Sequence, residues 1–266
     1  MRAILILSLT MIFFGSELFA GGHSSTLQDV KARGKLRCVV TTGLPGFAAP
    51  DANGVWRGFD WDFCRATAAA VLGDANAVDP ITSTGKTRFT KLNAGEGDVL
   101  WRNTTITFSR DVSVKLRFLG VNYYDGQGFM VNKSLGVSSA KELDGASVCI
   151  QTGTTTELNL ADYFSSNNMS YEAVTIETND EARQNYEAGR CDIYTTDASG
   201  LASTRSSLPN PNDHMVLPEI ISKEPLGPAV RQGDDAWADI ITWVLAATIT
   251  AEAVSYTHLR AHETSL

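Results

Sequence analysis

The sequence has 266 residues, and 22 Lys and Arg residues against 30 Asp and Glu residues give a formal charge of −8. Binding to nucleic-acid phosphates needs a basic face, so this charge argues against a nucleic-acid partner. With 43 % hydrophobic and 20 % charged residues the chain is an ordinary globular protein, which excludes intrinsic disorder. At about 100 to 150 residues per domain, we expect two domains.

The N-terminus is typical of a secretory signal peptide. Arg2 precedes an apolar run over residues 3–14, and a possible cleavage point follows Ala20. The run is shorter than the ~20 apolar residues that cross a bilayer. We therefore predict a cleaved signal peptide over residues 1–20. An uncleaved anchor is the alternative, because Leu18 at the −3 position is larger than signal peptidase prefers.

The next segments alternate between strand and helix patterns. A short apolar run from Leu36 to Val40 predicts a strand that ends in a loop, and apolar spacing from Phe59 to Gly73 predicts a helix. Segments 88–101 and 180–196 each show a short helix, a glycine stop, an aspartate and a strand. This alternation indicates an α/β fold of mainly parallel sheets flanked by helices.

The repeated pattern predicts two similar α/β lobes. Residues 126–134 and 222–234 read as extended connectors between them, and two connectors form a hinge. In such folds ligands bind beyond the carboxyl ends of the strands. We therefore look for the site in the loops that follow strands.

Four cysteines in an exported chain permit disulfides. Three pairings are possible, and we favour Cys149 with Cys191 and Cys38 with Cys64, because each pair falls within one lobe. Buried free thiols are the alternative. No CxxC spacing and no histidine at ligand distance accompany them, so we expect no metal site.

The first candidate loop contains Asn103, Thr105 and Arg110. An arginine presents a planar fork that matches a carboxylate, and hydroxyl groups beside it can complete the carboxylate's hydrogen bonds. The alternative is a surface ion pair between Arg110 and Asp111.

The second loop leads from a strand into a helix through Gly153, Thr154 and Thr155. Thr154 and Glu157 have capping-box spacing, so unpaired N–H groups at the helix start could hold an anion. Simple helix capping without a ligand is the alternative.

The third loop carries Asp197, directly after a predicted strand. A carboxylate there could hold an ammonium group, or it could be only the N-cap of the following helix. Together the three loops offer a fork for a carboxylate, amides for an anion and an acid for an ammonium. These are the parts of an α-amino acid site.

Several motifs closely resemble the periplasmic general L-amino acid-binding proteins of polar amino acid ABC transporters, within the family 3 bacterial solute-binding proteins. The resemblance covers residues 26–252, and the motifs are DVLWRNTTITFSRD, NYYDGQGFMV, VCIQTGTTTELNLADYF, AGRCDIYTTDASGLA and SKEPLGPAV. It implies a type II two-lobe clamp that binds L-amino acids. Arg110, Asn103 and Thr105 would contact the ligand α-carboxylate. Thr155 would add a contact from the second lobe, and Asp197 would hold the α-ammonium.

The resemblance also implies the partners. We expect a monomer that delivers its ligand to an inner-membrane permease, in the periplasm, without cofactor, metal or catalytic residues. A periplasmic enzyme on the same fold, such as a dehydratase, is the alternative, because a fold does not fix a function. Leu44 stands where related single-ligand binders often have an aromatic residue, and its presence favours broad specificity.

The resemblance also sets the predicted domain boundaries. Residues 21–128 form the first part of lobe I, 129–224 form lobe II, and 225–253 return to lobe I incompletely, because the family continues for further helices. Residues 254–266 resemble translated adaptor sequence, and we expect a non-native tail. Its His258 and His262 lack the glutamate of a zinc-binding HExxH motif.

Overall fold

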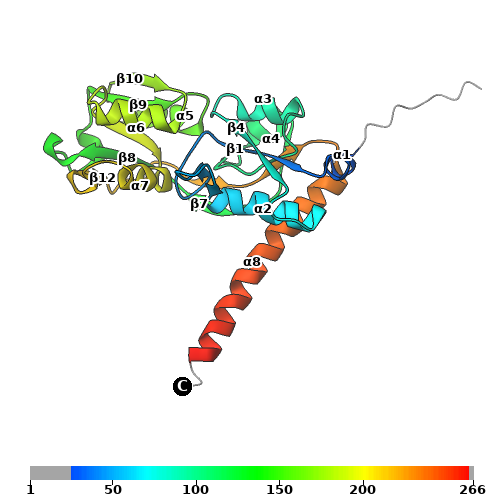
Figure 1. Cartoon of the computed structure of the whole chain (residues 1–266). Helices are drawn as coiled ribbons and strands as arrows, with labels where there is room; N and C mark the ends of the chain where they lie inside the picture. The colour runs from blue at the N-terminus through cyan, green and yellow to red at the C-terminus, as the bar shows by residue number, and fades with distance from the viewer. Residues whose placement is uncertain (1–24, 264–266) are drawn as a thin grey trace, which may run out of the picture.

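The computed structural model describes residues 25–263, which form two α/β lobes joined by a two-stranded hinge (Figure 1). The predicted signal peptide, residues 1–20, lies outside the described residues. Each lobe has one five-stranded sheet. The expected two-lobe α/β clamp is therefore confirmed.

Lobe I contains the first half of the chain and returns for its last strand. Its sheet has the order β4-β1-β5-β14-β6, in which β1 pairs parallel with β4 and β5 while β14 pairs antiparallel with β5 and β6. Four strands thus share one direction and β14 is reversed. The elements are α1 (Thr26–Arg33), β1 (Leu36–Thr41), β2 (Ala49–Pro50), β3 (Trp56–Arg57), α2 (Phe59–Leu72), β4 (Val78–Ser83), α3 (Arg88–Asn93), β5 (Val99–Leu100), α4 (Phe108–Val112), β6 (Leu116–Phe118) and β14 (Ala229–Arg231).

Lobe II repeats this plan. Its sheet has the order β10-β9-β11-β8-β12, with β9 parallel to β10 and β11, and with β8 as the one reversed strand. The elements are β8 (Gln127–Asn132), η1 (Lys133–Leu135), η2 (Ala140–Glu142), β9 (Ala146–Gln151), α5 (Thr155–Ser166), β10 (Tyr171–Ile176), α6 (Asn179–Glu187), β11 (Ile193–Asp197), α7 (Ala198–Ser206), η3 (Pro211–Asp213) and β12 (His214–Val216).

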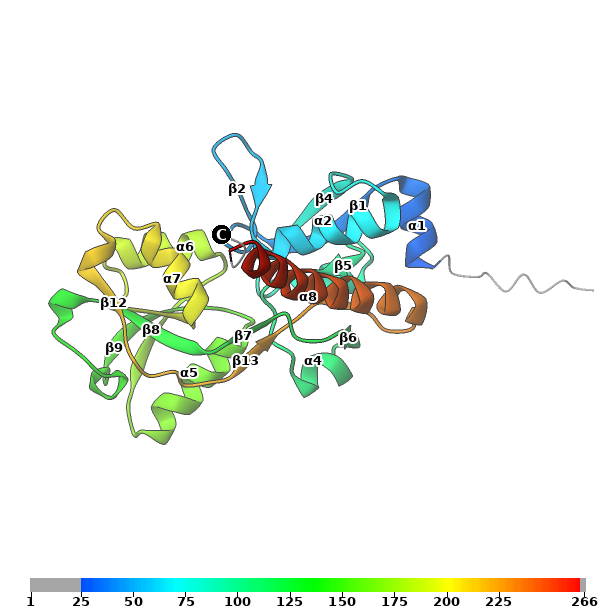
Figure 2. The same ribbon diagram turned by 90° about the horizontal axis from the view of Figure 1, so that it is seen from below.

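The hinge consists of β7 (Tyr123–Asp125) and β13 (Glu224–Leu226), which pair antiparallel between the lobes (Figure 2). The sequence prediction placed the first connector at residues 126–134, and this was wrong by several residues. Residues 127–132 form β8 between β11 and β12 in the lobe II sheet, where Phe129, Met130 and Val131 are fully buried. An apolar run buried on both faces of a sheet lacks the alternation that marks a strand, so it was read as a connector.

Each lobe holds one disulfide. Cys38 is joined to Cys64 between β1 and α2, with Cα atoms 6.0 Å apart. Cys149 is joined to Cys191 beside β9 and β11, with Cα atoms 5.6 Å apart. These are the two pairs within single lobes that the sequence analysis favoured over the other pairings.

The long helix α8 (Asp235–Glu263) begins against lobe I, where Trp237, Ile241 and Leu245 are buried beside α2, and then extends away from the body of the protein (Figure 1). It includes residues 254–263 of the predicted tail, so the helix continues through the point where the sequence pattern changes. Among residues 25–263, no helix is long and apolar enough to cross a membrane.

Candidate functional site

The two lobes touch, and all three predicted loops contribute residues where they meet. The hydroxyl oxygens of Thr105 in lobe I and Thr155 in lobe II lie 3.2 Å apart. The Ser203 hydroxyl of α7 donates to the carbonyl oxygen of Pro45 at 2.7 Å, which links the lobes a second time. The clamp is therefore closed, and residues more than 40 positions apart in sequence share one buried site.

Arg110 lies inside this site. It is on α4, where the Thr107 side chain caps the helix by accepting the Arg110 N–H at 3.3 Å. Only 7 % of Arg110 is exposed, and its guanidinium donates to the Thr105 carbonyl oxygen at 2.7 Å. Burial lowers the pKa of Arg110 to about 10. A buried guanidinium that faces the cleft does not fit the alternative of a surface ion pair with Asp111.

Asp197 faces Arg110 from the other lobe. It ends β11 and occupies the N-cap position of α7, but its side chain forms no capping hydrogen bond. It is 6 % exposed, and burial raises its pKa to about 8, with Asp125 and Glu224 adding to the rise and Arg88 and Arg110 opposing it. A buried carboxylate that caps no helix is free to bind a cation.

Glu224 is a site residue that the sequence analysis missed. It lies on the hinge strand β13, is 2 % exposed, and accepts hydrogen bonds from both lobes. Its Oε2 accepts from the hydroxyls of Thr105 and Thr155, and its Oε1 accepts from Asn159 at 2.7 Å and from Ser222 at 2.6 Å. The carboxylate thus joins lobe I, lobe II and the hinge.

These bonds also fix the direction of two hydroxyl protons. A threonine hydroxyl has one proton to donate, and both Thr105 and Thr155 direct it to Glu224. Their remaining hydrogen-bonding capacity is as acceptors, which suits a ligand ammonium and does not fit the α-carboxylate contact that the resemblance implied for Thr105. Glu224 stands in the quoted motif SKEPLGPAV, but only the pairing of β13 with β7 brings it between the lobes.

Two residues of the second predicted loop form hydrogen bonds within the loop and the first turn of α5. The Thr154 hydroxyl caps α5 by accepting the Glu157 N–H at 3.3 Å, and the Gly153 N–H donates to the Glu157 carboxylate at 2.9 Å. These hydrogen bonds are the ones expected of simple helix capping, the alternative reading of this loop. Thr155, the first residue of α5, is the one of the three that reaches across to lobe I.

Asn103 and Leu44 lie at the border of the site. The Asn103 backbone N–H donates to the buried Asp60 carboxylate at 2.9 Å, while its side-chain Oδ1 is buried without a partner among the described residues. Leu44 is 3 % exposed and packs with Phe47 and Leu226 of the hinge. A ligand role for these two residues remains a prediction.

Two further arginines line the lobe I side and were also missed. Arg88 is 2 % exposed and Arg102 is 4 % exposed. Burial lowers the pKa of both, to about 10 for Arg102. Arg102 lies in the quoted motif DVLWRNTTITFSRD, but nothing in the sequence marks it as buried, because arginines are mostly exposed in proteins.

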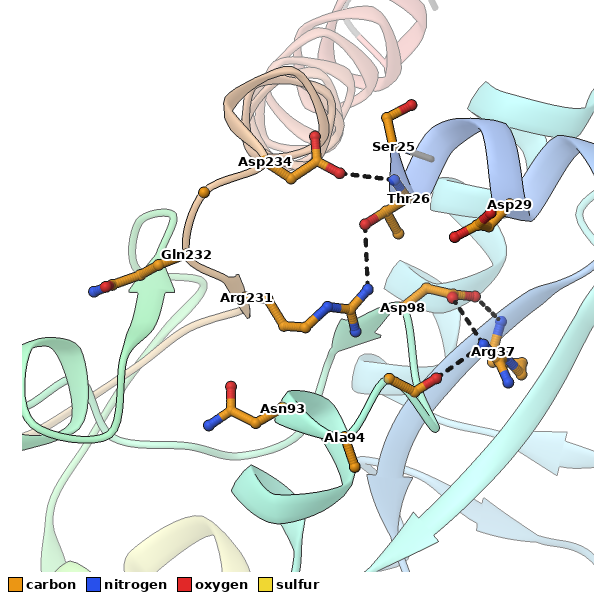
Figure 3. Close-up of a pocket in the computed structure, with 12 residues that line it drawn as sticks. Ser25, Thr26, Asp29, Arg37, Asn93, Ala94, Asp98, Arg231, Gln232 and Asp234 are labelled. Atoms are coloured by element: carbon orange, nitrogen blue, oxygen red, sulfur yellow. Dashed lines mark hydrogen bonds and ion pairs between the residues drawn. The ribbon is translucent and has the colours of Figure 1, made fainter. Parts of the chain in front are cut away.

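A second hollow, of about 650 Å³, lies at the end of lobe I where α1 and the start of α8 meet (Figure 3). Arg231 there donates to the carbonyl oxygens of Leu92 and Gly97 at 2.9 and 2.6 Å and to the Thr26 hydroxyl at 3.2 Å. Asp234 accepts the Thr26 N–H at 2.7 Å. These bonds join the ends of lobe I, so the hollow has a structural explanation.

The sequence comparisons agree with this geometry. The family of bacterial extracellular solute-binding proteins, family 3, matches residues 36–257. The chain belongs to this family. It is 61 % identical over 256 residues to the glutamate/glutamine/aspartate/asparagine-binding protein BztA of Rhodobacter capsulatus, covering 94 % of this chain and 76 % of that protein.

Two more proteins are similar over most of the chain. The general L-amino acid-binding periplasmic protein AapJ of Rhizobium johnstonii is 56 % identical, covering 94 % of this chain and 74 % of that protein. A solved ABC transporter periplasmic binding protein from Brucella ovis, with glutathione bound, is 55 % identical with a TM-score of 0.85, covering 88 % of this chain and 73 % of that chain. The family and the clamp fold expected from the motifs are confirmed.

Proposed function

We propose that this protein is the periplasmic substrate-binding component of an ABC transporter and that it captures L-amino acids of more than one kind. The observation that carries the proposal is the placement of Arg110 and Asp197 on opposite lobes of one buried cleft. Arg110 is suited to the α-carboxylate and Asp197 to the α-ammonium. A ligand that has both groups bridges the lobes, whereas a ligand with one group does not.

Closure provides the mechanism. Ligand contacts that exist only when both lobes meet favour the closed state over the open one. The Thr105–Thr155 contact and the four hydrogen bonds to Glu224 define that closed state here. The closed, loaded monomer is then the form that an inner-membrane permease recognises, after export of the chain by the predicted signal peptide.

Binding without turnover is the expected behaviour, although a dehydratase-like enzyme on this fold needs a direct test. The buried Asp60 and Asp197, with pKa values raised by burial to about 7 and about 8, are the groups that an enzyme could use as acids. In our proposal Asp197 instead binds a cation and Asp60 holds the Asn103 N–H. Product analysis after incubation with each bound ligand distinguishes the two functions.

Calorimetric titration of the purified chain with the common L-amino acids tests the proposal. We expect stoichiometric binding of several L-amino acids, no binding of sugars, and recovery of each ligand unchanged. Asp197→Ala should abolish measurable binding, because the ligand ammonium then enters a cleft without its counterion. Unchanged affinity in Asp197→Ala would refute the site, and formation of product would favour the enzyme.

A further inference from the structure

Helix α7 is capped by a residue from another element. Its own N-cap position is held by Asp197, which forms no capping hydrogen bond with its side chain within the described part of the chain. The carboxylate of Asp125, the last residue of the hinge strand β7, instead accepts the Ser199 N–H at 3.4 Å and the Ser199 hydroxyl proton. The Ser199 N–H belongs to the first turn of α7, where an N-cap aspartate ordinarily accepts a hydrogen bond. Asp125 therefore supplies the cap that Asp197 does not.

The same hinge segment also holds the start of α7 through its backbone. The Ala198 N–H donates to the Gly126 carbonyl oxygen at 2.8 Å, and the Gly126 N–H donates to the Asp125 carboxylate at 2.9 Å. Only glycine fits at position 126, because a Cβ atom there would lie 2.4 Å from the Ile220 side chain and 2.8 Å from the Ser222 carbonyl oxygen. Residues 125 and 126 thus fix the first turn of α7 against the hinge.

Asp125 and Asp197 are close enough to compete for the same N–H groups. Burial is the main cause of the raised pKa of Asp197, and the negative charge of Asp125 is the next. Glu224 adds to the rise, whereas Arg88 and Arg110 oppose it. An N–H group that is bonded to one carboxylate is not available to the other. Because Asp125 occupies the Ser199 N–H, the Asp197 carboxylate keeps its acceptor positions for a ligand.

We propose that Asp125 is a positioning residue of the ligand ammonium site: it caps α7 in place of Asp197 and so leaves the Asp197 carboxylate for the ligand. This inference rests on the proposed function and adds to it the residue that keeps the ammonium partner available. In this role Asp125 acts through Asp197. Since Asp125 also ends β7, it joins the hinge strand directly to the helix that follows the ammonium partner.

Two variants at position 125 separate the cap from the charge. Asp125→Ala removes both, whereas Asp125→Asn removes only the charge, because asparagine caps a helix as well as aspartate does. In Asp125→Ala the Asp197 carboxylate can turn to the open Ser199 N–H, and the ligand must displace it. Calorimetry should therefore show amino acid binding about fivefold weaker in Asp125→Ala than in Asp125→Asn, the factor that corresponds to one helix cap.

The probes are L-glutamate and L-glutamine, which share the α-ammonium and differ in side-chain charge. The ratio between the two variants should be the same for both ligands. Asp144→Ala is the matched control, because the exposed Asp144 of lobe II accepts the N–H and the hydroxyl of Ser170 at 2.8 and 3.1 Å, as Asp125 does those of Ser199. It should lower the melting temperature about as much as Asp125→Ala does, while affinity stays within about twofold of the unaltered protein.

Proton release on binding is a readout that a purely structural role would not change. In ligand-free Asp125→Ala, a hydrogen bond from the Ser199 N–H would favour the ionised form of Asp197 and lower its pKa. Binding at pH 7 should then release fewer protons in Asp125→Ala than in Asp125→Asn. If Asp125→Ala does not fold, Ser199→Ala removes the hydroxyl that holds Asp125 and should weaken binding about twofold or more relative to its control Ser170→Ala.

The outcomes separate this inference from the proposed function. Equal affinity of Asp125→Ala and Asp125→Asn, an equal loss of affinity in Asp144→Ala, or equal affinity of Ser199→Ala and Ser170→Ala refutes the positioning role alone. A ratio that differs between glutamate and glutamine places Asp125 at the ligand side chain and refutes it as well. Failure of the unaltered protein to bind any amino acid refutes the proposed function and this inference together.

Discussion

The raised pKa of Asp197 makes amino acid binding depend on pH. With a pKa of about 8 in the ligand-free protein, this carboxyl is about 90 % protonated at pH 7. A ligand ammonium favours the ionised form, so binding at pH 7 should release close to one proton. The affinity for a zwitterionic amino acid should therefore rise about 50-fold between pH 6 and pH 8. Titration calorimetry in buffers of different ionisation enthalpy measures both quantities.

The same shift predicts how the ligand-free protein responds to pH. The folded-state pKa lies above the unfolded value, so the stabilising contribution of Asp197 is complete below about pH 4 and is lost as the pH rises through about 8. Saturating ligand should remove this loss. In Asp197→Asn, whose side chain is neutral at every pH, ligand affinity and unfolding free energy should both change less with pH. Affinity that is independent of pH, with no proton release, would refute an ammonium site at Asp197.

Three further predictions concern Glu224, the second loop and the disulfide of lobe II. Glu224→Ala removes the acceptor of four hydrogen bonds, so we expect the unfolding free energy to fall by about 3 kcal/mol. The lobes should also separate, which would increase the radius of gyration measured by X-ray scattering. An unchanged radius would contradict the role of Glu224 in closure. Thr155→Val should lower ligand affinity while the unfolding free energy stays nearly constant. Thr154→Val should lower the unfolding free energy by about 1 kcal/mol with little effect on affinity. Identical effects of the two variants would mean that both residues only cap α5. Replacing Cys149 and Cys191 by Ala should destabilise lobe II by about 4 kcal/mol, because their disulfide closes a loop with a sequence separation of 42. Denaturant unfolding measures this loss. A change below about 1 kcal/mol would exclude the chain-entropy explanation.

The elements that sequence patterns predicted best are those with strong local signals. The strand from Leu36 and the helix from Phe59 lie within one residue of their predicted ends, because apolar periodicity and a glycine stop define them locally. The first connector was misplaced, because strand β8 is buried on both faces and shows no alternation. Its assignment depends on pairing with β11 and β12, which come later in the chain.

The sequence by itself determined the family and the two-lobe α/β plan. It also proposed Arg110, Asp197 and Thr155 as site residues, since each follows a strand and carries a functional group suited to an amino acid. Tertiary structure decided the rest of the site. Glu224 becomes a cleft residue only because β13 pairs with β7, which places its carboxylate between Thr105 and Thr155. The burial of Arg102 is likewise invisible in sequence, because whether a charge is buried depends on residues distant in the chain.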